Sequence, residues 1–478
     1  MRRYKGRRGG GKIMNDKTKR FFCNIGDWFK SLFTIQNGQE PKMLTFYKKP
    51  GTKSIISSVL CILAGVVVGF IVMLIIAAAS PEISAADAFR GLGIILGGPF
   101  SSGTAKYVNM NFGDMIFYSG PLIMTGLSVA VAFKTGLFNI GAPGQYYMGT
   151  MGSLLVALSI PSSNGAQSFF IWLFAIIVGM AFGALWGALP GLFRAFFNVN
   201  EVIVCIMTNW ISANIVTWVF SSMPHLANTG MGKSGYLITT AVTGNGTPKI
   251  GLDKIFPGSY IDIGIILAIV VAIVLVIILN KTTFGYELKA CGNNRYASKY
   301  AGMNEKRNVV LSMVIAGALA GVGGALYYLN PGIEFQFLSA YGSLPDYGFN
   351  GIPVALLASS NPIGIIFTGI FLRYIAQGGN ELTSAGYNRY IADIIIALII
   401  YFAGFSKLFV DILSRRQKKL SAKVQLKIEQ KAKTIDSKEE YVLEKDASET
   451  FAESIKEAVN ETEDASPVNT DKKEVDPQ

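Results

Sequence analysis

The chain has 478 residues, of which 51% are hydrophobic and only 15% are charged, whereas typical soluble domains have about 25% charged residues. This composition excludes an ordinary soluble protein and indicates an integral membrane protein. The net charge of +12 is concentrated at the ends and in one internal loop, so anionic lipids and membrane topology account for it without nucleic-acid binding.

The distribution of charge divides the chain into three parts. We expect residues 1–54 to form a basic cytoplasmic arm, in which residues 20–34 either form a helix that lies on the inner leaflet or are disordered. Residues 55–413 are nearly free of charge and are predicted to form the transmembrane domain. Residues 414–478 are rich in Lys and Glu and poor in aromatic residues, so we expect a helical extension that fades into disorder.

Apolar runs in the middle part predict an all-α, polytopic membrane protein. Each long run is close to the ~20 residues that a helix needs to cross a bilayer. The predicted spans are 55–79, 115–133, 137–160, 168–193, 201–223, 261–280, 309–329 and 388–405. Shorter apolar pieces at 87–98, 345–358 and 363–376 have no clear assignment as spans.

Basic residues near the spans predict the orientation. Lys48, Lys49 and Lys53 precede the first span, and alternating spans place the basic loop 281–307 on the same side, which the positive-inside rule identifies as the cytoplasm. The basic residues after 405 also require the cytoplasmic side. Both termini are therefore predicted to be cytoplasmic, and this requires one re-entrant or broken element between Pro345 and Ala376, where we expect the break at Gly348, Gly351, Pro353, Pro362 or Gly364.

Glycine, proline and amide residues interrupt one predicted span. The segment Lys134–Gln145 contains Asn139, Pro143 and Gln145 together with three glycines. Such an interruption is tolerated in a bilayer only where the backbone packs on protein or lines a wet cavity. This segment therefore predicts a path for a polar solute.

A secondary transporter driven by an ion gradient is a possible alternative, and it normally needs carboxylates inside its spans. Asp393 lies inside the last predicted span with Arg389 one turn before it. We favour mutual neutralisation of this pair over a role in ion coupling.

A membrane-embedded enzyme is the third alternative, but the sequence contains few residues that could form its active site. The one histidine, His225, has no His or Cys near it in the sequence, and no metal site is expected. Gly232-Lys233-Ser234 resembles the end of a phosphate-binding loop, but Ala227 stands where that loop requires a glycine. We therefore predict no ATPase site and no bound cofactor in this chain.

The internal loop at residues 283–304 is predicted to form two short helices separated by Gly292-Asn293-Asn294. Its basic and aromatic side chains suit a surface for a partner protein. They are equally typical of a solvated cytoplasmic loop, and the residues alone leave both interpretations open.

Two motifs carry a resemblance to a known family. Phe138-Asn139-Ile140-Gly141-Ala142-Pro143-Gly144-Gln145 resembles the FNIGAEGQ signature of ABC transporter permeases of the branched-chain amino acid and ribose type, in the nucleoside and simple-sugar uptake subgroup. The loop 285–303 resembles the GxELxAxGxNxxAAxYAG segment of that family. Shorter matches occur at 200–203, 209–211, 348–357 and 361–364. The chain departs from the pattern at Pro143, which replaces a Glu, at Ser298, which replaces an Ala, and in its longer termini.

The resemblance implies about ten transmembrane helices in the cell membrane, including broken or re-entrant elements. It implies four kinds of partner: a second permease subunit, ATP-binding cassette ATPases that use ATP, a substrate-binding lipoprotein, and membrane lipids. It also implies that loop 285–303 docks on the ATPases. The residues that it assigns to ATPase coupling are Glu287, Lys289, Gly292, Asn294, Tyr300 and Gly302.

The same resemblance places the substrate pathway at Phe138, Asn139, Gln145 and Asn209. Neutral amides suit a neutral polyhydroxy solute because they donate and accept without a buried charge; interhelical hydrogen bonding is the alternative role for them. Asn214 is a weaker candidate than Asn209. The sequence thus predicts a permease subunit that imports nucleosides, with simple sugars as the close alternative.

Overall fold

The computed structural model describes residues 50–228, 230, 233–405, 408–426, 429–430, and residues 445, 448, 450, 452, 454 and 456. The predictions for the basic arm before residue 50 and for most of the tail lie outside these residues. Residues Ser54–Val410 form one compact unit, to which the description of the fold refers. The predicted boundaries of the three parts of the chain remain predictions.

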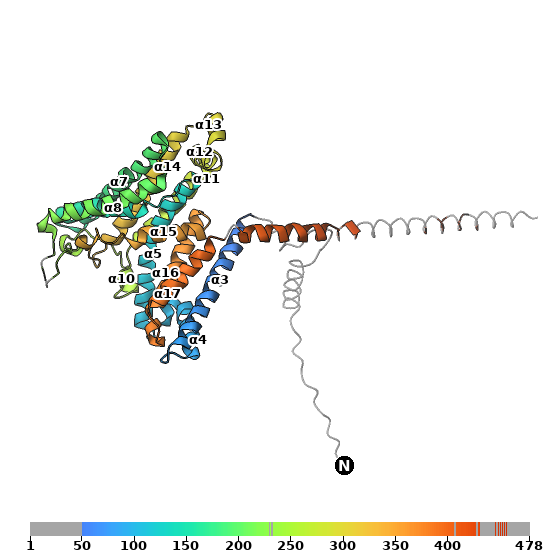
Figure 1. Ribbon diagram of the computed structural model, residues 1–478, viewed down its shortest axis with the longest axis horizontal. Coiled ribbons are helices and arrows are strands. Elements are labelled where there is room, and N and C mark those ends of the chain that lie inside the picture. The colour runs from blue at the N-terminus through green and yellow to red at the C-terminus, as the bar shows by residue number, and fades with distance from the viewer. Residues whose placement is uncertain are drawn as a thin grey trace, which may run out of the picture. The chain divides into compact units, whose positions relative to one another are not determined.

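The described residues form α-helices joined by turns, short 3₁₀ helices and two isolated β-bridges, with no strand among them (Figure 1). The helices are α3 (Pro50–Ala79), α4 (Ala85–Gly97), α5 (Ala105–Lys134), α6 (Ala142–Ser159), α7 (Gly165–Phe197), α8 (Glu201–Ser221), α9 (Thr240–Thr243), α10 (Leu252–Ile255), α11 (Gly264–Lys281), α12 (Thr283–Asn293), α13 (Arg295–Tyr300), α14 (Glu305–Tyr328), α15 (Asp346–Leu357), α16 (Pro362–Asn380) and α17 (Tyr390–Ala403).

Six of the described helices are long and apolar enough to cross a membrane: α3, α5, α7, α8, α11 and α14. A seventh results if α17 and the helix at Leu408–Leu426, which are bent by 51° at the break between them, form one span. The all-α, polytopic fold is thus confirmed, whereas a count of ten spans is not. Helices α4 and α15, with 13 and 12 residues, are each shorter than a span requires.

Helix α5 begins at Ala105, well before the predicted start at 115, because hydrogen bonds from other segments satisfy its polar first turns. Asn111 donates to Ser102 Oγ and to Glu381 Oε1. Asp114 Oδ1 accepts a bond of 2.8 Å from the backbone N–H of Tyr260. Hydropathy alone does not detect a helix whose polar residues have tertiary partners.

The chain is broken between α15 and α16, within the region 345–376 where a break was predicted. The break falls at residues 358–361, where Ser359 and Ser360 have φ of 51° and 55°, a left-handed conformation that ends a helix. Asn361 then caps α16, and Pro362 stands at its start. The prediction that Gly348, Gly351 and Pro353 form the break is wrong, because all three lie inside α15.

Helices α5 and α14 form the centre of the bundle, since 83% and 72% of their most apolar segments are buried, whereas α3, α7, α8 and α11 are only 28–33% buried. The α14 glycines allow close contacts with neighbouring helices. A Cβ atom at Gly317 would overlap the carbonyl oxygen of Gly183 on α7, and one at Gly321 would lie 2.5 Å from the carbonyl oxygen of Gly179.

The connections after α8 and α14 are tied to each other. Lys233, the lysine of the apparent phosphate-loop remnant, forms an ion pair of 2.7 Å with Glu334. Leu237 donates its backbone N–H to Phe335. Asn330 donates to Asp262 Oδ2 at 2.7 Å, and burial raises the pKa of the Asp262 carboxyl to about 7 although this bond lowers it.

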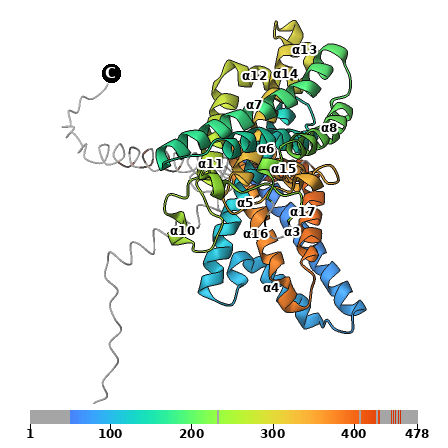
Figure 2. The same cartoon turned by 90° about the vertical axis from the view of Figure 1, so that its left-hand side faces the viewer.

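In both views, α12 and α13 lie at one end of the compact unit and α4 lies toward the other (Figure 2). The two main motifs that resemble the permease family fall on different elements: one on the interrupted segment between α5 and α6, and the other on the α12–α13 pair.

Candidate functional site

The interrupted segment is a buried turn between α5 and α6. Its first part is held by Thr135, whose hydroxyl oxygen lies 2.8 Å from both the Ala132 carbonyl oxygen and Ser312 Oγ of α14, within hydrogen-bond distance of each. Gly136 follows with φ of +70°, a conformation that favours glycine. Helix α6 then begins only at Ala142, so residues 137–141 of the predicted span are not helical.

Asn139 and Gln145 form a reciprocal amide pair. Asn139 Nδ2 donates to Gln145 Oε1 at 2.8 Å, and Gln145 Nε2 donates to Asn139 Oδ1 at 3.0 Å. Both side chains are almost fully buried, and Asn139 also contacts Ser128 Oγ of α5. In this conformation each amide satisfies the other, so the pair holds the turn against the start of α6.

Asn209 joins this turn to α8. Its Oδ1 accepts from the backbone N–H of Gly144 at 2.9 Å, and its Nδ2 donates to the Ile140 carbonyl at 3.0 Å. Gly144 lies in the first turn of α6, where backbone N–H groups have no partner inside the helix. Asn209 therefore caps α6 from a different helix.

Pro143 is compatible with its place in the structure. It occupies the second position of α6, where the missing N–H costs no intrahelical hydrogen bond. The helix α15 packs directly on it, because a Cβ atom at Gly348 would overlap Pro143. Two of the family-like motifs, 138–145 and 348–357, are thus in contact.

The predicted pathway residues lie together around this turn. Phe138 is half-buried and stacks on Phe133 with ring centroids 5.6 Å apart. Asn209 also borders a cavity of about 460 Å³ with Ile140, Trp210, Ser343 and Phe349 among its lining residues. Asn214 is exposed and donates to the Trp210 carbonyl of its own helix. Asn209 is thus the more interior of the two asparagines.

Helix α12 is fixed to the bundle by polar contacts. Glu287 Oε2 accepts a bond of 3.0 Å from Asn308 Nδ2 of α14, and Lys289 Nζ donates to Asn280 Oδ1 at the end of α11. Lys289 also lines a small cavity of about 170 Å³ with Lys134 and with the break between α15 and α16. Asn308 was not among the sequence-based candidates. It follows another asparagine, Asn304, and nothing in the sequence indicated that its side chain is buried.

Gly292, at the end of α12, contacts the turn directly. A Cβ atom at Gly292 would overlap the carbonyl oxygen of Lys134 and lie 3.1 Å from the backbone nitrogen of Gly136. Only glycine allows this distance, so α12 and the α5–α6 turn are in backbone contact. Movement of α12 toward the bundle would therefore push on the turn that holds Asn139.

Helix α13 continues from this contact and is strongly exposed. Asn294 caps it by accepting from the Ala297 N–H. Tyr300 is 92% exposed and Tyr296 is 79% exposed, and Gly302 follows with φ of +79° and no atom that a Cβ would meet. Exposed tyrosines of this kind are typical of protein interfaces.

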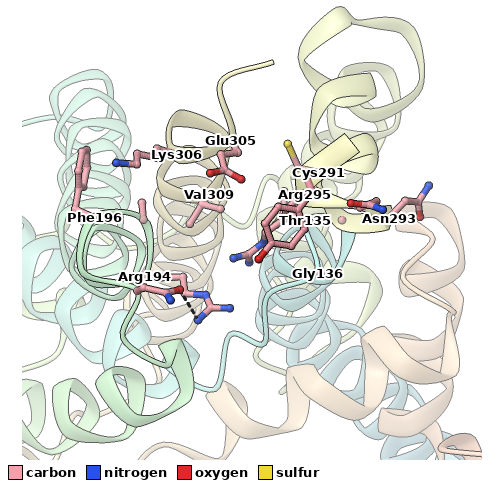
Figure 3. A pocket seen from close by; sticks show the side chains of 15 residues that line it. Thr135, Gly136, Arg194, Phe196, Cys291, Asn293, Arg295, Glu305, Lys306 and Val309 are labelled. Atoms are coloured by element: carbon pink, nitrogen blue, oxygen red, sulfur yellow. Dashed lines mark hydrogen bonds between the residues drawn. The ribbon is translucent and has the colours of Figure 1, made fainter. Parts of the chain in front are cut away.

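A cleft of about 600 Å³ separates α12–α13 from α7 and the start of α14 (Figure 3). Cys291, Arg295 and Thr135 lie on one side, and Arg194, Phe196 and Lys306 lie on the other. Arg194 Nε is 3.2 Å from Glu201 Oε2 of α8, and the Lys306 Nζ lies 5.3 Å from the Phe196 ring centroid. The predicted coupling residues Gly292 and Asn294 both line this cleft.

The expected Arg389–Asp393 pair is not formed. Arg389 lies over the ring of Tyr390 at 5.2 Å, and within the described part of the chain neither residue makes an ion pair. The exposed Asp393 interacts with the arginine one turn before it only through space, without a direct ion pair.

The fold and this site define a helical membrane protein with a buried polar turn that contacts an exposed helical pair. A family model described as branched-chain amino acid transport system / permease component matches residues 111–404. The chain belongs to this family. It is a multi-pass membrane protein and a permease component of a multi-subunit ABC system.

Three relatives illustrate the similarity. The nucleoside ABC transporter permease protein NupB of Lactococcus lactis subsp. cremoris (strain MG1363) is 37% identical over 313 residues, 65% of this chain and 84% of NupB. The guanosine ABC transporter permease protein NupP of Bacillus subtilis (strain 168) is 34% identical over 336 residues, 68% of this chain and 92% of NupP. The glucose ABC transporter permease protein TsgB13 of Haloferax volcanii is 28% identical over 304 residues, 62% of this chain and 76% of TsgB13. No solved structure matches this chain.

Proposed function

We propose that this chain forms the translocation path for nucleosides in an ABC importer and that separate ATPase subunits drive it. The observation that carries the proposal is the backbone contact between Gly292 and the Lys134–Gly136 turn. It connects an exposed element suited to a partner with a buried polar turn at the start of α6. The similarity to NupB and NupP supports nucleosides as the solute.

The proposed mechanism uses this contact to transmit movement. Closure of the ATPases pushes α12 and α13, where Tyr300 at the end of α13 and Gly302 just after it are exposed, and Gly292 passes the displacement to the turn. Glu287 and Lys289 keep α12 attached to α14 and α11 during the movement. Because Asn139, Gln145 and Asn209 tie the turn to α6 and α8, these helices shift with it and open the path on alternate sides.

The partners and the location follow from the same proposal. A second permease subunit completes the path, ATP-binding cassette ATPases dock on α12–α13, and a substrate-binding lipoprotein delivers the solute. The chain has no ATPase site and no cofactor of its own, and it lies in the cell membrane with both termini in the cytoplasm.

Simple sugars are the second candidate, since TsgB13 is named as a glucose permease. The test is uptake of a radiolabelled nucleoside by cells with and without this chain, in competition with excess unlabelled sugars or branched-chain amino acids. We expect nucleoside uptake to be lost without the chain and sugars not to compete. Unchanged nucleoside uptake together with lost sugar uptake would contradict the proposal and favour a sugar permease.

A further inference from the structure

An arginine lies among tyrosines inside the helical bundle, apart from the turn described above. The Arg373 guanidinium of α16 lies 4.7 Å from the ring centroid of Tyr118 on α5 and 5.8 Å from that of Tyr347 on α15. Tyr118 is near the middle of α5, one of the two central helices. Arg373 thus packs against one of the central helices, and charged side chains inside the helical bundle of a membrane protein are rare and generally functional.

Tyrosines from two further elements complete this arginine–tyrosine cluster. Tyr327 of α14 lies 6.1 Å from Tyr118 and 4.9 Å from Tyr347, between ring centroids. Tyr260, from the connection before α11, lies 6.2 Å from Tyr118. The members of the cluster are Tyr118, Tyr260, Tyr327, Tyr347 and Arg373. All five are half-buried.

The Arg373 guanidinium has no carboxylate in direct contact among the described residues. Within the described residues it forms no ion pair, and its Nε is buried without a hydrogen-bond partner. The carboxylate of Asp114 accepts the backbone N–H of Tyr260 and interacts with Arg373 only through space. A buried donor without an acceptor is costly in a protein interior, and a ligand that supplies the acceptor removes this cost.

The chemistry of the cluster fits a planar heterocycle with a carbonyl group. Tyrosine rings offer faces for stacking, and aromatic stacking tolerates any base. A guanidinium is planar and always charged, and its N–H groups donate in a fixed fork to acceptors such as a ring carbonyl and ring nitrogen. A sugar offers hydroxyl groups but neither a large planar face nor a carbonyl acceptor.

We infer that the arginine–tyrosine cluster binds the base of the transported nucleoside, with Arg373 donating to the base carbonyl and Tyr118 stacking on its face. This inference rests on the proposed function. It places a specificity-determining contact on α5 and α16, whereas the sequence motifs predicted the substrate pathway at the turn before α6.

The test compares two nucleosides that differ at the base carbonyl and in the hydrogen on the neighbouring ring nitrogen. Inosine has a carbonyl at position 6 of the purine ring, and purine riboside lacks it. Uptake is measured at saturating concentration in cells that depend on this chain, with its amount in the membrane quantified. We expect Arg373→Lys to lower the maximal uptake rate of inosine about tenfold, because roughly one charged hydrogen bond is lost. The maximal uptake rate of purine riboside should change less than about twofold.

The matched control is Arg389→Lys, because Arg389 also lies over a tyrosine ring but outside the cluster. It should leave both rates unchanged. Equal losses for the two nucleosides in Arg373→Lys, or no loss for either, would overturn the inference. A wild-type chain that supports no nucleoside uptake would instead contradict the proposed function, so the two failures are distinguishable.

A second pair of variants keeps the inference testable if Arg373→Lys does not reach the membrane. Tyr118→Phe retains the ring and should keep nearly the wild-type rate. Tyr118→Leu removes the aromatic face and should lower nucleoside uptake about tenfold, since stacking on one ring contributes about 1–3 kcal/mol. Equal rates for Phe and Leu at this position would contradict stacking.

Discussion

Asn209 is the single residue on which the start of α6 depends most clearly. Its side chain is 2% exposed and bonds to two backbone groups of the turn and of α6. Replacement by Ala leaves the Gly144 N–H and the Ile140 carbonyl without these partners. We therefore expect Asn209→Ala to lower the free energy of unfolding by about 1–2 kcal/mol, measured by denaturation in detergent.

Asn214→Ala is the matched control, because the exposed Asn214 bonds only to its own helix. It should change the free energy of unfolding by no more than about 0.5 kcal/mol. Equal losses of unfolding free energy in the two variants would show that the Asn209 cap on α6 stabilises the fold no more than the local hydrogen bond of Asn214 does.

Asp262 gives the fold a pH dependence. Burial raises the pKa of this carboxyl to about 7 in the folded chain from the ordinary value of 3.8. The folded state thus binds the proton more tightly than the unfolded state, so the contribution to stability is largest at low pH and is lost as the pH rises through 7. We expect the melting temperature in detergent to fall between pH 6 and pH 8.

Asp262→Asn should remove most of this fall, because the amide carries no charge at either pH. The exposed Asp253 provides the control, since Asp253→Asn should leave the pH dependence unchanged. A fall of the same size in Asp262→Asn and wild type would contradict this account of Asp262.

Single residues were only partly predictable. The sequence identified Asn139, Gln145 and Asn209 by residue type and placed Asn209 ahead of Asn214, but not the hydrogen bonds between Asn139 and Gln145. The i, i+4 spacing of Arg389 and Asp393 predicted an ion pair that is not formed, because Arg389 lies over the adjacent Tyr390 ring. Side-chain rotamers depend on tertiary neighbours, which spacing along one helix does not reveal.

At the scale of elements, the packing of α7 on α14 depends on glycine. A Cβ atom at Gly183 would overlap the Gly317 carbonyl oxygen and lie 2.8 Å from the Gly321 Cα. Overpacking of this kind typically costs about 1–3 kcal/mol, so Gly183→Ala should lower the thermal stability measured in detergent. Gly93→Ala, on α4, is the control because a Cβ there meets no atom; an equal effect of both changes would contradict glycine-dependent packing.

The contact of α12 with the α5–α6 turn is the second element-scale test. In Gly292→Ala the methyl group overlaps the Lys134 carbonyl oxygen, so α12 must move away from the turn. We expect ATP hydrolysis by the assembled complex to continue while nucleoside uptake falls about tenfold or more, with normal amounts of the chain in the membrane.

Ser298→Ala is the control for this change, because it lies in the same segment and restores the residue that the family pattern has at that position. It should leave both uptake and hydrolysis unchanged. Normal uptake by Gly292→Ala would contradict the role of this contact in coupling.

Long apolar runs predicted most of the large helices, because burial in lipid or protein requires a continuous apolar segment. The start of α5 could not be predicted in this way, since Asn111 and Asp114 are tolerated only through partners on distant segments. The break at Ser359 and Ser360 was also missed. Gly348 and Gly351 looked like helix breakers but serve to bring α15 close to Pro143 and Thr125.

At the scale of the whole molecule, composition and periodicity were sufficient for the fold class, and the two motifs were sufficient for the family. The arginine–tyrosine cluster could not be predicted, because its members come from α5, α14, α15, α16 and the connection before α11. Each of them alone is an ordinary tyrosine or arginine in an apolar segment. Only the packing of these elements brings the five side chains together.

The most direct test of the account is nucleoside uptake by the purified complex reconstituted in proteoliposomes, with ATP enclosed on the side of the ATPases. The account predicts that uptake requires both ATP and this chain and persists when proton and sodium gradients are collapsed. Uptake by this chain without the ATPases, driven by an imposed ion gradient and abolished by its collapse, would contradict the account and identify a secondary transporter.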